Sequence, residues 1–206
     1  EFDANAGISQ KRKPVKEARV PGGAGHGCGH NLFGTASLGA AIAIKEQIEK
    51  GNIKGTVIFY GTPAEETIFA KVWMVREGLF DKLDVCMDWH PGDEIQAGTQ
   101  SSKALVDFRV EFRGSSAHAS SDPWNGKSAA DAMELYTTGL NYYREHIEPT
   151  ARIHYQIEKA GDVVNVVPDY AQIWTRLRQN NRAGVDVLYE RALDIAKGAA
   201  LMTGTT

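Results

Sequence analysis

Hydrophobic residues recur at helical spacing over residues 32–50, and Gly51 follows them as a stop signal. One amphipathic helix is therefore expected there, and a second is expected over 70–80. Two short runs, 56–60 (TVIFY) and 84–89 (DVCMDW), are mostly apolar, which is typical of strands buried on both faces. Cys86 lies inside the second run and is predicted to pack in the core. The order strand, helix, strand predicts an α/β layer with a mainly parallel sheet flanked by helices.

The pattern changes after Gly98. A partly alternating stretch at 104–112 suits a strand with one exposed face, and residues 128–144 predict a helix. Further strands are expected at 152–157 and 172–177, and a last helix at 185–202. This order predicts a smaller α+β sandwich, so we place two domains at 1–98 and 99–206.

Composition narrows the class of protein. The 206 residues are 42% hydrophobic and 24% charged, which is ordinary for a globular chain. A formal net charge of −3 and only one short basic cluster, at 11–13, favour neither a nucleic-acid nor a membrane partner. No apolar run approaches the roughly 20 residues that span a bilayer. Two cysteines, one of them among histidines, form a poor disulfide framework, so a reducing, cytoplasmic location is expected.

Potential metal ligands follow the predicted strands or precede the first helix. They are Cys28 and His30 in GHGCGH, Glu65 and Glu66 in GTPAEE, and His90. Ligands of open α/β sheets gather beyond the carboxyl ends of the strands, so these groups could converge. Thiolate, imidazole and carboxylate form a ligand set that zinc prefers and manganese tolerates. Each group alone is commonly structural or merely solvated; their conjunction is what predicts a metal site.

The motifs GHGCGHN, GTPAEE, DWHPG and FRGSSAHAS, in this order, resemble the M20 metallopeptidase and amidohydrolase family, in the branch with a Cys-Gly-His motif. One departure is the segment Ala-Asn-Ala-Gly at 4–7, where the family has Ala-Leu-Pro-Gly, so that Asn5 and Ala6 replace Leu and Pro. The resemblance implies that 1–98 is a partial catalytic domain with a di-metal site. It also implies that 99–206 is a lid and dimerisation domain, incomplete at its C-terminal end.

The resemblance also implies roles for single residues. The ligands of two divalent ions, Zn²⁺ or Mn²⁺, would be Cys28, His30, Glu66 and His90. Glu65 would be the general base, and His118 would help stabilise the oxyanion, often across a dimer interface. Asn165 and Arg178 would grip the substrate carboxylate, with Arg176 as a competitor for the second role. One further family ligand matches no residue here, so we expect it outside this chain and expect the chain alone to hydrolyse amides poorly.

These matches predict a metal-dependent amidohydrolase that cleaves the amide bond of a small N-acyl amino acid such as aminobenzoyl-glutamate. A dipeptidase or an auxin-conjugate hydrolase of the same family is an alternative. A noncatalytic metal-binding or dimerisation module is an alternative of another class, but it would dispense with Glu65. A homodimer formed through the lid domain is expected, with a second related subunit as a further partner.

Overall fold

The computed structural model describes residues 3–99 and 101–206. The chain forms two compact units, Glu1–Ala97 and Gly98–Thr206. None of the helices in the part of the chain described is long and apolar enough to cross a membrane.

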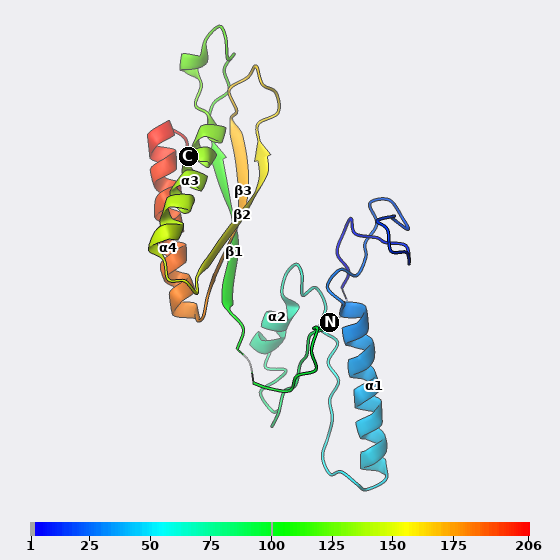
Figure 1. The fold of residues 1–206 in the computed structure, drawn as a ribbon. Coiled ribbons are helices and arrows are strands. Elements are labelled where there is room, and N and C mark those ends of the chain that lie inside the picture. Colours follow the sequence, from blue (N-terminus) through cyan, green and yellow to red (C-terminus); the bar gives the residue numbers. More distant parts are fainter. Residues whose placement is uncertain (1–2, 100) are drawn as a thin grey trace. The chain divides into compact units, whose positions relative to one another are not determined.

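The first unit contains two helices, α1 (His30–Glu49) and α2 (Ala70–Arg76), joined by turns and extended chain (Figure 1). The predicted helix over 32–50 is confirmed and begins two residues earlier. The helix expected over 70–80 is shorter, because residues 77–82 form turns. The buried side chains of α1, His30 and Phe33, lie in its first turn, whereas Leu32, Leu38 and Ile42 are exposed. The N-terminal end of α1 is therefore the packed part of this helix.

The two strands predicted at 56–60 and 84–89 are wrong for this structure. Neither stretch forms a strand, and the side chains of Ile58 and Met87 are 54% and 83% exposed. Cys86 is also exposed rather than packed in a core. A parallel strand needs neighbouring strands to satisfy its N–H and C=O groups, and no described residue of this unit pairs with either stretch. The expected parallel sheet is accordingly absent from the described residues.

The second unit has the predicted β-α-β-β-α order. Its strands are β1 (Ala104–Arg113), β2 (Arg152–Ala160) and β3 (Tyr170–Gln179), and its main helices are α3 (Ala129–Tyr143) and α4 (Arg182–Thr203). The strands form an antiparallel sheet in the order β1-β3-β2, and both helices lie on one face of it (Figure 1). The prediction of a two-layer α+β sandwich is confirmed.

Strand β3 shows how the sequence pattern builds this sandwich. Its odd-numbered residues, from Ala171 to Gln179, are buried, while its even-numbered residues are half-buried. Successive side chains of a strand point to opposite faces, so the odd set packs under α3 and α4. Phe112, Tyr136 and Leu140 complete the core from β1 and α3. The even set, which includes Trp174, Arg176 and Arg178, is left on the open face of the sheet.

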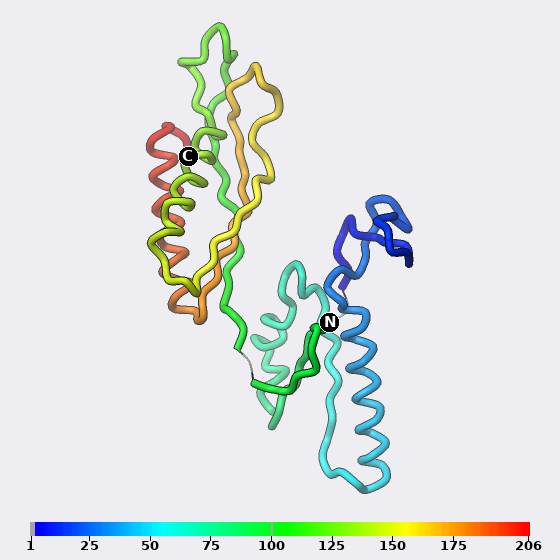
Figure 2. Tube along the Cα trace, viewed as in Figure 1, coloured from blue at the N-terminus to red at the C-terminus, as the bar shows by residue number. Residues whose placement is uncertain are grey.

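Two loops meet at the end of the sheet farthest from the start of β1, within 114–127 and 161–169 (Figure 2). His118 and Val166 form an isolated antiparallel bridge between them, and the N–H of Val167 donates to the carbonyl of Ala117 at 2.9 Å. Backbone pairing therefore fixes the position of these loops without a regular strand.

Candidate active site

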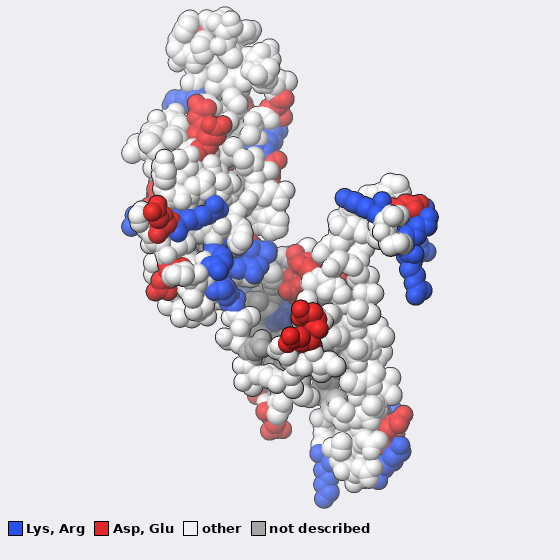
Figure 3. Space-filling view, viewed as in Figure 1, with Lys and Arg blue, Asp and Glu red and all other residues white. Residues whose placement is uncertain are grey.

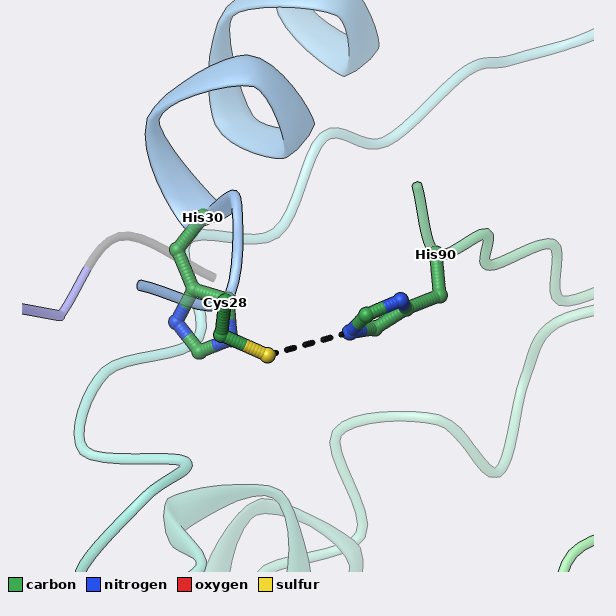
Figure 4. A group of neighbouring side chains, drawn as sticks. All are labelled: Cys28, His30 and His90. Atoms are coloured by element: carbon green, nitrogen blue, oxygen red, sulfur yellow. Dashed lines mark hydrogen bonds between the residues drawn. The ribbon is translucent and has the colours of Figure 1, made fainter. Parts of the chain in front are cut away.

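The loop before α1 brings the predicted ligands Cys28 and His30 close to His90. Gly29 has φ +85°, a left-handed conformation that favours glycine, and a Cβ here would lie 3.0 Å from Cγ of Pro91. The glycine thus lets the segment carrying His90 approach the helix. The thiol of Cys28 points at the imidazole of His90, with Sγ and Nε2 3.2 Å apart (Figure 4). His30, the first residue of α1, lies beside them.

A tight turn presents the two glutamates. Ala64 has φ 54°, which is unusual for a residue with a side chain. Its carbonyl accepts the N–H groups of Thr67, Ile68 and Phe69 at 3.0 to 3.3 Å, and these bonds hold the turn. Glu65 Oε2 and Glu66 Oε1 lie 3.7 and 3.9 Å from Nε2 of His30. Both carboxylates therefore face the same imidazole, and distance alone does not distinguish base from ligand.

Hydrogen bonds select the tautomer of both histidines. Nδ1 of His30 lies 2.9 Å from Oδ1 of Asp3, and Nδ1 of His90 lies 3.0 Å from the carbonyl oxygen of Pro91. Because these oxygens accept hydrogen bonds, the neutral rings carry their proton on Nδ1 and keep a lone pair on Nε2. In both residues Nε2 faces the other predicted ligands. This arrangement is typical of metal-binding histidines oriented by an outer carboxylate or carbonyl.

The sequence interpretation missed two contributors from the N-terminal segment. Besides orienting His30, Asp3 accepts the backbone N–H of Glu66 at 3.0 Å. Asn5 pairs with Gly25 through both backbone groups and directs its amide to Glu66 Oε1 at 3.5 Å. The departure from the family pattern at Asn5 thus lies at the site. An acidic residue before a run of small residues was the available signal for Asp3.

The cluster is electrostatically suited to a cation. Burial, together with Glu66, Glu65 and Asp3, raises the pKa of the Cys28 thiol. Burial also opposes ionisation of Asp3, but N–H donors from the backbone and His30 outweigh it and lower the pKa of its carboxyl. Several acidic groups therefore surround a thiol that they keep protonated. A divalent ion reverses this, since it stabilises thiolate and carboxylate alike.

The donor set fits a divalent metal. The ligand atoms of Cys28, His30 and His90 all lie within 4.8 Å of one another, and so do those of His30, Glu65 and Glu66. The two groups share His30, whose side chain is buried. Phe33 packs against the site with its ring centroid 6.1 Å from those of His30 and His90. The structure thus gathers all four predicted ligands and the predicted base within the first unit.

In the second unit, the two meeting loops hold His118 and Asn165. The N–H of Ala119 donates to the carbonyl of Asn165 at 3.0 Å. Nδ1 of His118 lies 3.2 and 3.3 Å from the N–H groups of Ser120 and Ser121. Because Nδ1 accepts these bonds, the proton of the neutral ring lies on Nε2, which suits a hydrogen-bond donor to an oxyanion.

Arg178 lies at the other end of β3 from these loops. Tyr170 and Arg178 are separated by eight residues of extended strand, roughly 26 Å. Asn165 precedes Tyr170, so Asn165 and Arg178 of one copy do not reach the same carboxylate. The guanidinium of Arg176 is committed to Asp107, with Nε and Nη2 2.7 and 2.6 Å from its two oxygens. Nε of Arg178 is buried without a hydrogen-bond partner among the described residues. Arg178 is therefore the better of the two for an external carboxylate.

The site and sandwich define a metal-dependent hydrolase class, and comparison with known families agrees. Residues 4–190 match the model of peptidase family M20/M25/M40, so the chain belongs to this family.

Particular relatives narrow this further. Over its whole length the chain is 45% identical to one of the subunits of p-aminobenzoyl-glutamate hydrolase from Escherichia coli (strain K12), covering 43% of that protein. It is 35% identical to Xaa-Arg dipeptidase of Mus musculus, with 88% of the chain and 42% of the relative covered. A crystal structure of aminobenzoyl-glutamate utilization protein from Klebsiella pneumoniae matches 65% of this chain and 35% of that one, with 30% identity and a TM-score of 0.52. The chain thus spans less than half the length of these relatives.

Proposed function

We propose that this chain carries the metal site of an amidohydrolase that cleaves N-acyl amino acids, with p-aminobenzoyl-glutamate as the first candidate substrate. One observation carries the proposal: the buried imidazole of His30 lies in both groups of potential ligands. Cys28 and His90 complete one group, and the two glutamates complete the other. The 45% identity to part of a hydrolase named for that substrate supports the choice.

Cys28, His30, Glu66 and His90 would hold two divalent ions, Zn²⁺ or Mn²⁺, whose chemistry is to lower the pKa of water and polarise an amide carbonyl. Glu65 takes a proton from the attacking water and returns it to the leaving nitrogen. Glu66 is held by Asn5 and by the bond from its own N–H to Asp3, which keeps its carboxylate oriented. Two adjacent glutamates thereby take different roles.

We assign the binding of the oxyanion and of the substrate carboxylate to the second unit, which acts as lid and dimerisation domain. His118 donates from Nε2 to the oxyanion, and Arg178 binds the substrate carboxylate bidentately. Since Asn165 and Arg178 of one copy lie far apart, a homodimer would bring His118 and Asn165 of one copy to the Arg178 of the other. A second related protein could take the same place, since the E. coli hydrolase is named with two different subunits and both are similar to this chain.

The location follows from the thiol. Cys28 and Cys86 are both free, and a thiolate ligand needs reducing conditions, which the cytoplasm provides.

The experiment that tests this proposal distinguishes Glu65, as the general base, from Glu66, as a metal ligand. A chimera places this chain in the matching span of the E. coli relative, and its metal content and its hydrolysis of p-aminobenzoyl-glutamate are measured. We expect Glu65→Gln to lower kcat about 10²- to 10⁴-fold with metal content intact, because it removes only the proton acceptor. Glu66→Gln, the matched control, should lose metal as well as activity. Normal kcat in Glu65→Gln, or metal loss in that variant alone, contradicts the assignment.

A further inference from the structure

The open face of the sheet in the second unit contains a cavity of about 390 Å³. Its lining comes from the two neighbouring strands β2 and β3: His154, Tyr155, Gln156, Trp174, Arg176 and Arg178. Donor groups outnumber acceptors among these side chains, since the two guanidinium groups, the imidazole, the indole and the amide all offer N–H. The cavity is therefore suited to an anion with more than one acceptor group.

The two arginines of the cavity differ in what already holds them. Arg176 forms the bidentate pair with Asp107 and lies 5.6 Å from the ring centroid of Trp174. Arg109 lies 5.4 Å from the same ring and is itself paired with Glu158, the residue at the register irregularity of β2. These contacts fix Trp174 and neutralise Arg176 and Arg109. They leave Arg178, with its buried Nε, as the cation to be compensated by a ligand.

Strand register places His154 next to that cation. Arg152 and His154 of β2 pair with Arg178 and Arg176 of β3, and Gln156 pairs with Trp174. His154 is thus a diagonal neighbour of Arg178 on the same face, at a Cα separation of roughly 7–8 Å. Two carboxylates of one small molecule, three or four carbons apart, span a gap of this size. A cationic side chain of the ligand would instead meet the uncompensated guanidinium of Arg178, which costs repulsion.

We propose that this cavity binds the amino-acid half of the substrate and selects an aminodicarboxylate. Arg178 binds one carboxylate, and His154 with Gln156 binds the second. This inference rests on the proposed function for Arg178 and adds His154 and Gln156 as specificity-determining residues. Asp107 holds Arg176, and Arg109 packs on Trp174; neither Asp107 nor Arg109 lines the cavity.

The test measures binding rather than turnover, so it does not depend on metal or on Glu65. The 206-residue chain is titrated with glutarate, with butyrate, which lacks the second carboxylate, and with 4-guanidinobutyrate, which carries a cation there. Amide and indole NMR signals report both affinity and location. We expect glutarate to bind about tenfold more tightly than butyrate, and 4-guanidinobutyrate to bind most weakly of the three. Glutarate should also shift the NMR signals of Trp174 and β2.

Two variants complete the test. His154→Ala should remove the preference for glutarate over butyrate, whereas His146→Ala, outside this cavity, should retain it; Arg178→Ala should weaken both ligands. Equal binding of glutarate and butyrate overturns the inference, as does a preference for 4-guanidinobutyrate or a glutarate preference that survives in His154→Ala. The Glu65→Gln result on the chimera is independent, so failure here leaves the amidohydrolase proposal to be judged by that experiment.

Discussion

Single atoms at the candidate metal site carry distinct roles because their partners differ. Asp3 is the clearest case: its two oxygens bind Nδ1 of His30 and the N–H of Glu66. One carboxylate thus orients a residue from each of the two ligand groups. In the proposed metal site, Asp3 would act through His30 and Glu66 and would not itself be a ligand.

Asp3→Asn should weaken binding of zinc or manganese by about 10- to 100-fold, the usual effect of losing an outer carboxylate behind a metal-bound histidine. Competition with a chromogenic chelator measures the change. Asp81→Asn, in the same unit but outside the cluster, is the control and should bind metal normally. Equal affinity in both variants would show that Asp3 does not position His30.

At the scale of helices and strands, the ends of α1 and the register of β3 decide which side chains meet. The N-terminal end of α1 depends on one left-handed glycine, and the sheet depends on a buried helix face from α3. On the face shown in Figure 3, Lys and Arg side chains lie among Asp and Glu side chains. In the loop around 11–13, Glu17 pairs with both Lys11 and Lys13. One carboxylate thus pairs with two of the three basic side chains at 11–13.

Gly29→Ala should disturb the metal site before it disturbs the fold. A left-handed alanine costs roughly 1–2 kcal/mol, and its Cβ would also press on Pro91. We expect weaker metal binding and a lower melting temperature of the first unit. Gly39→Ala is the control: it lies within α1 with open space around it and should leave stability unchanged or slightly raised. Equal metal affinity and stability in the two variants would show that the metal site does not depend on the left-handed conformation of Gly29.

Tyr136 links α3 to the sheet through its hydroxyl, 3.2 Å from that of Thr175. Burial raises the pKa of Tyr136 to about 12. Because the folded-state pKa lies above the unfolded value, its contribution to stability is complete below about pH 10 and is lost as pH rises towards 12. The free energy of unfolding should fall by up to about 2–3 kcal/mol over that window.

Denaturant unfolding at pH 8, 10 and 11.5 tests this. Tyr136→Phe should show a shallower loss of stability above pH 10 than the parent chain, although it loses the hydrogen bond to Thr175. Parallel pH curves for the two proteins would assign the alkaline loss to other groups.

At the scale of the whole molecule, the proposed function requires groups that one copy does not bring together. His118 and Asn165 share one end of the second unit, and Arg178 lies at the other. The proposed homodimer resolves this separation by combining two copies.

Mixing two inactive chimeras tests whether His118 acts across the interface. A dimer of Glu65→Gln with His118→Ala contains one complete site if the histidine comes from the partner. After the copies exchange, activity should recover to at most about one quarter of the parent level, since half the dimers are mixed and each has one intact site. No recovery, with exchange verified by mass spectrometry, would place His118 in the site of its own copy.

The sequence by itself determined the helices α1, α3 and α4, the three strands of the second unit and the residue types of the metal site. Helical and alternating periodicities are local, so each segment carries its own signal. The glycines, the glutamate pair and His90 indicated chemistry because few structural reasons place such residues together. Their convergence within the first unit agrees with that interpretation, while their catalytic roles stay predictions.

Only the tertiary structure decided which groups meet. Apolar composition predicted strands at 56–60 and 84–89, but a strand exists through hydrogen bonds to partners, and composition does not supply these. Contacts distant in sequence made Asp3 and Asn5 part of the candidate site and paired Arg176 with Asp107. Among the described residues, Nε of Arg178 was left buried without a hydrogen-bond partner. The same strand that joins Asn165 to Arg178 in sequence holds them apart in space, because an extended backbone adds about 3.3 Å for every residue.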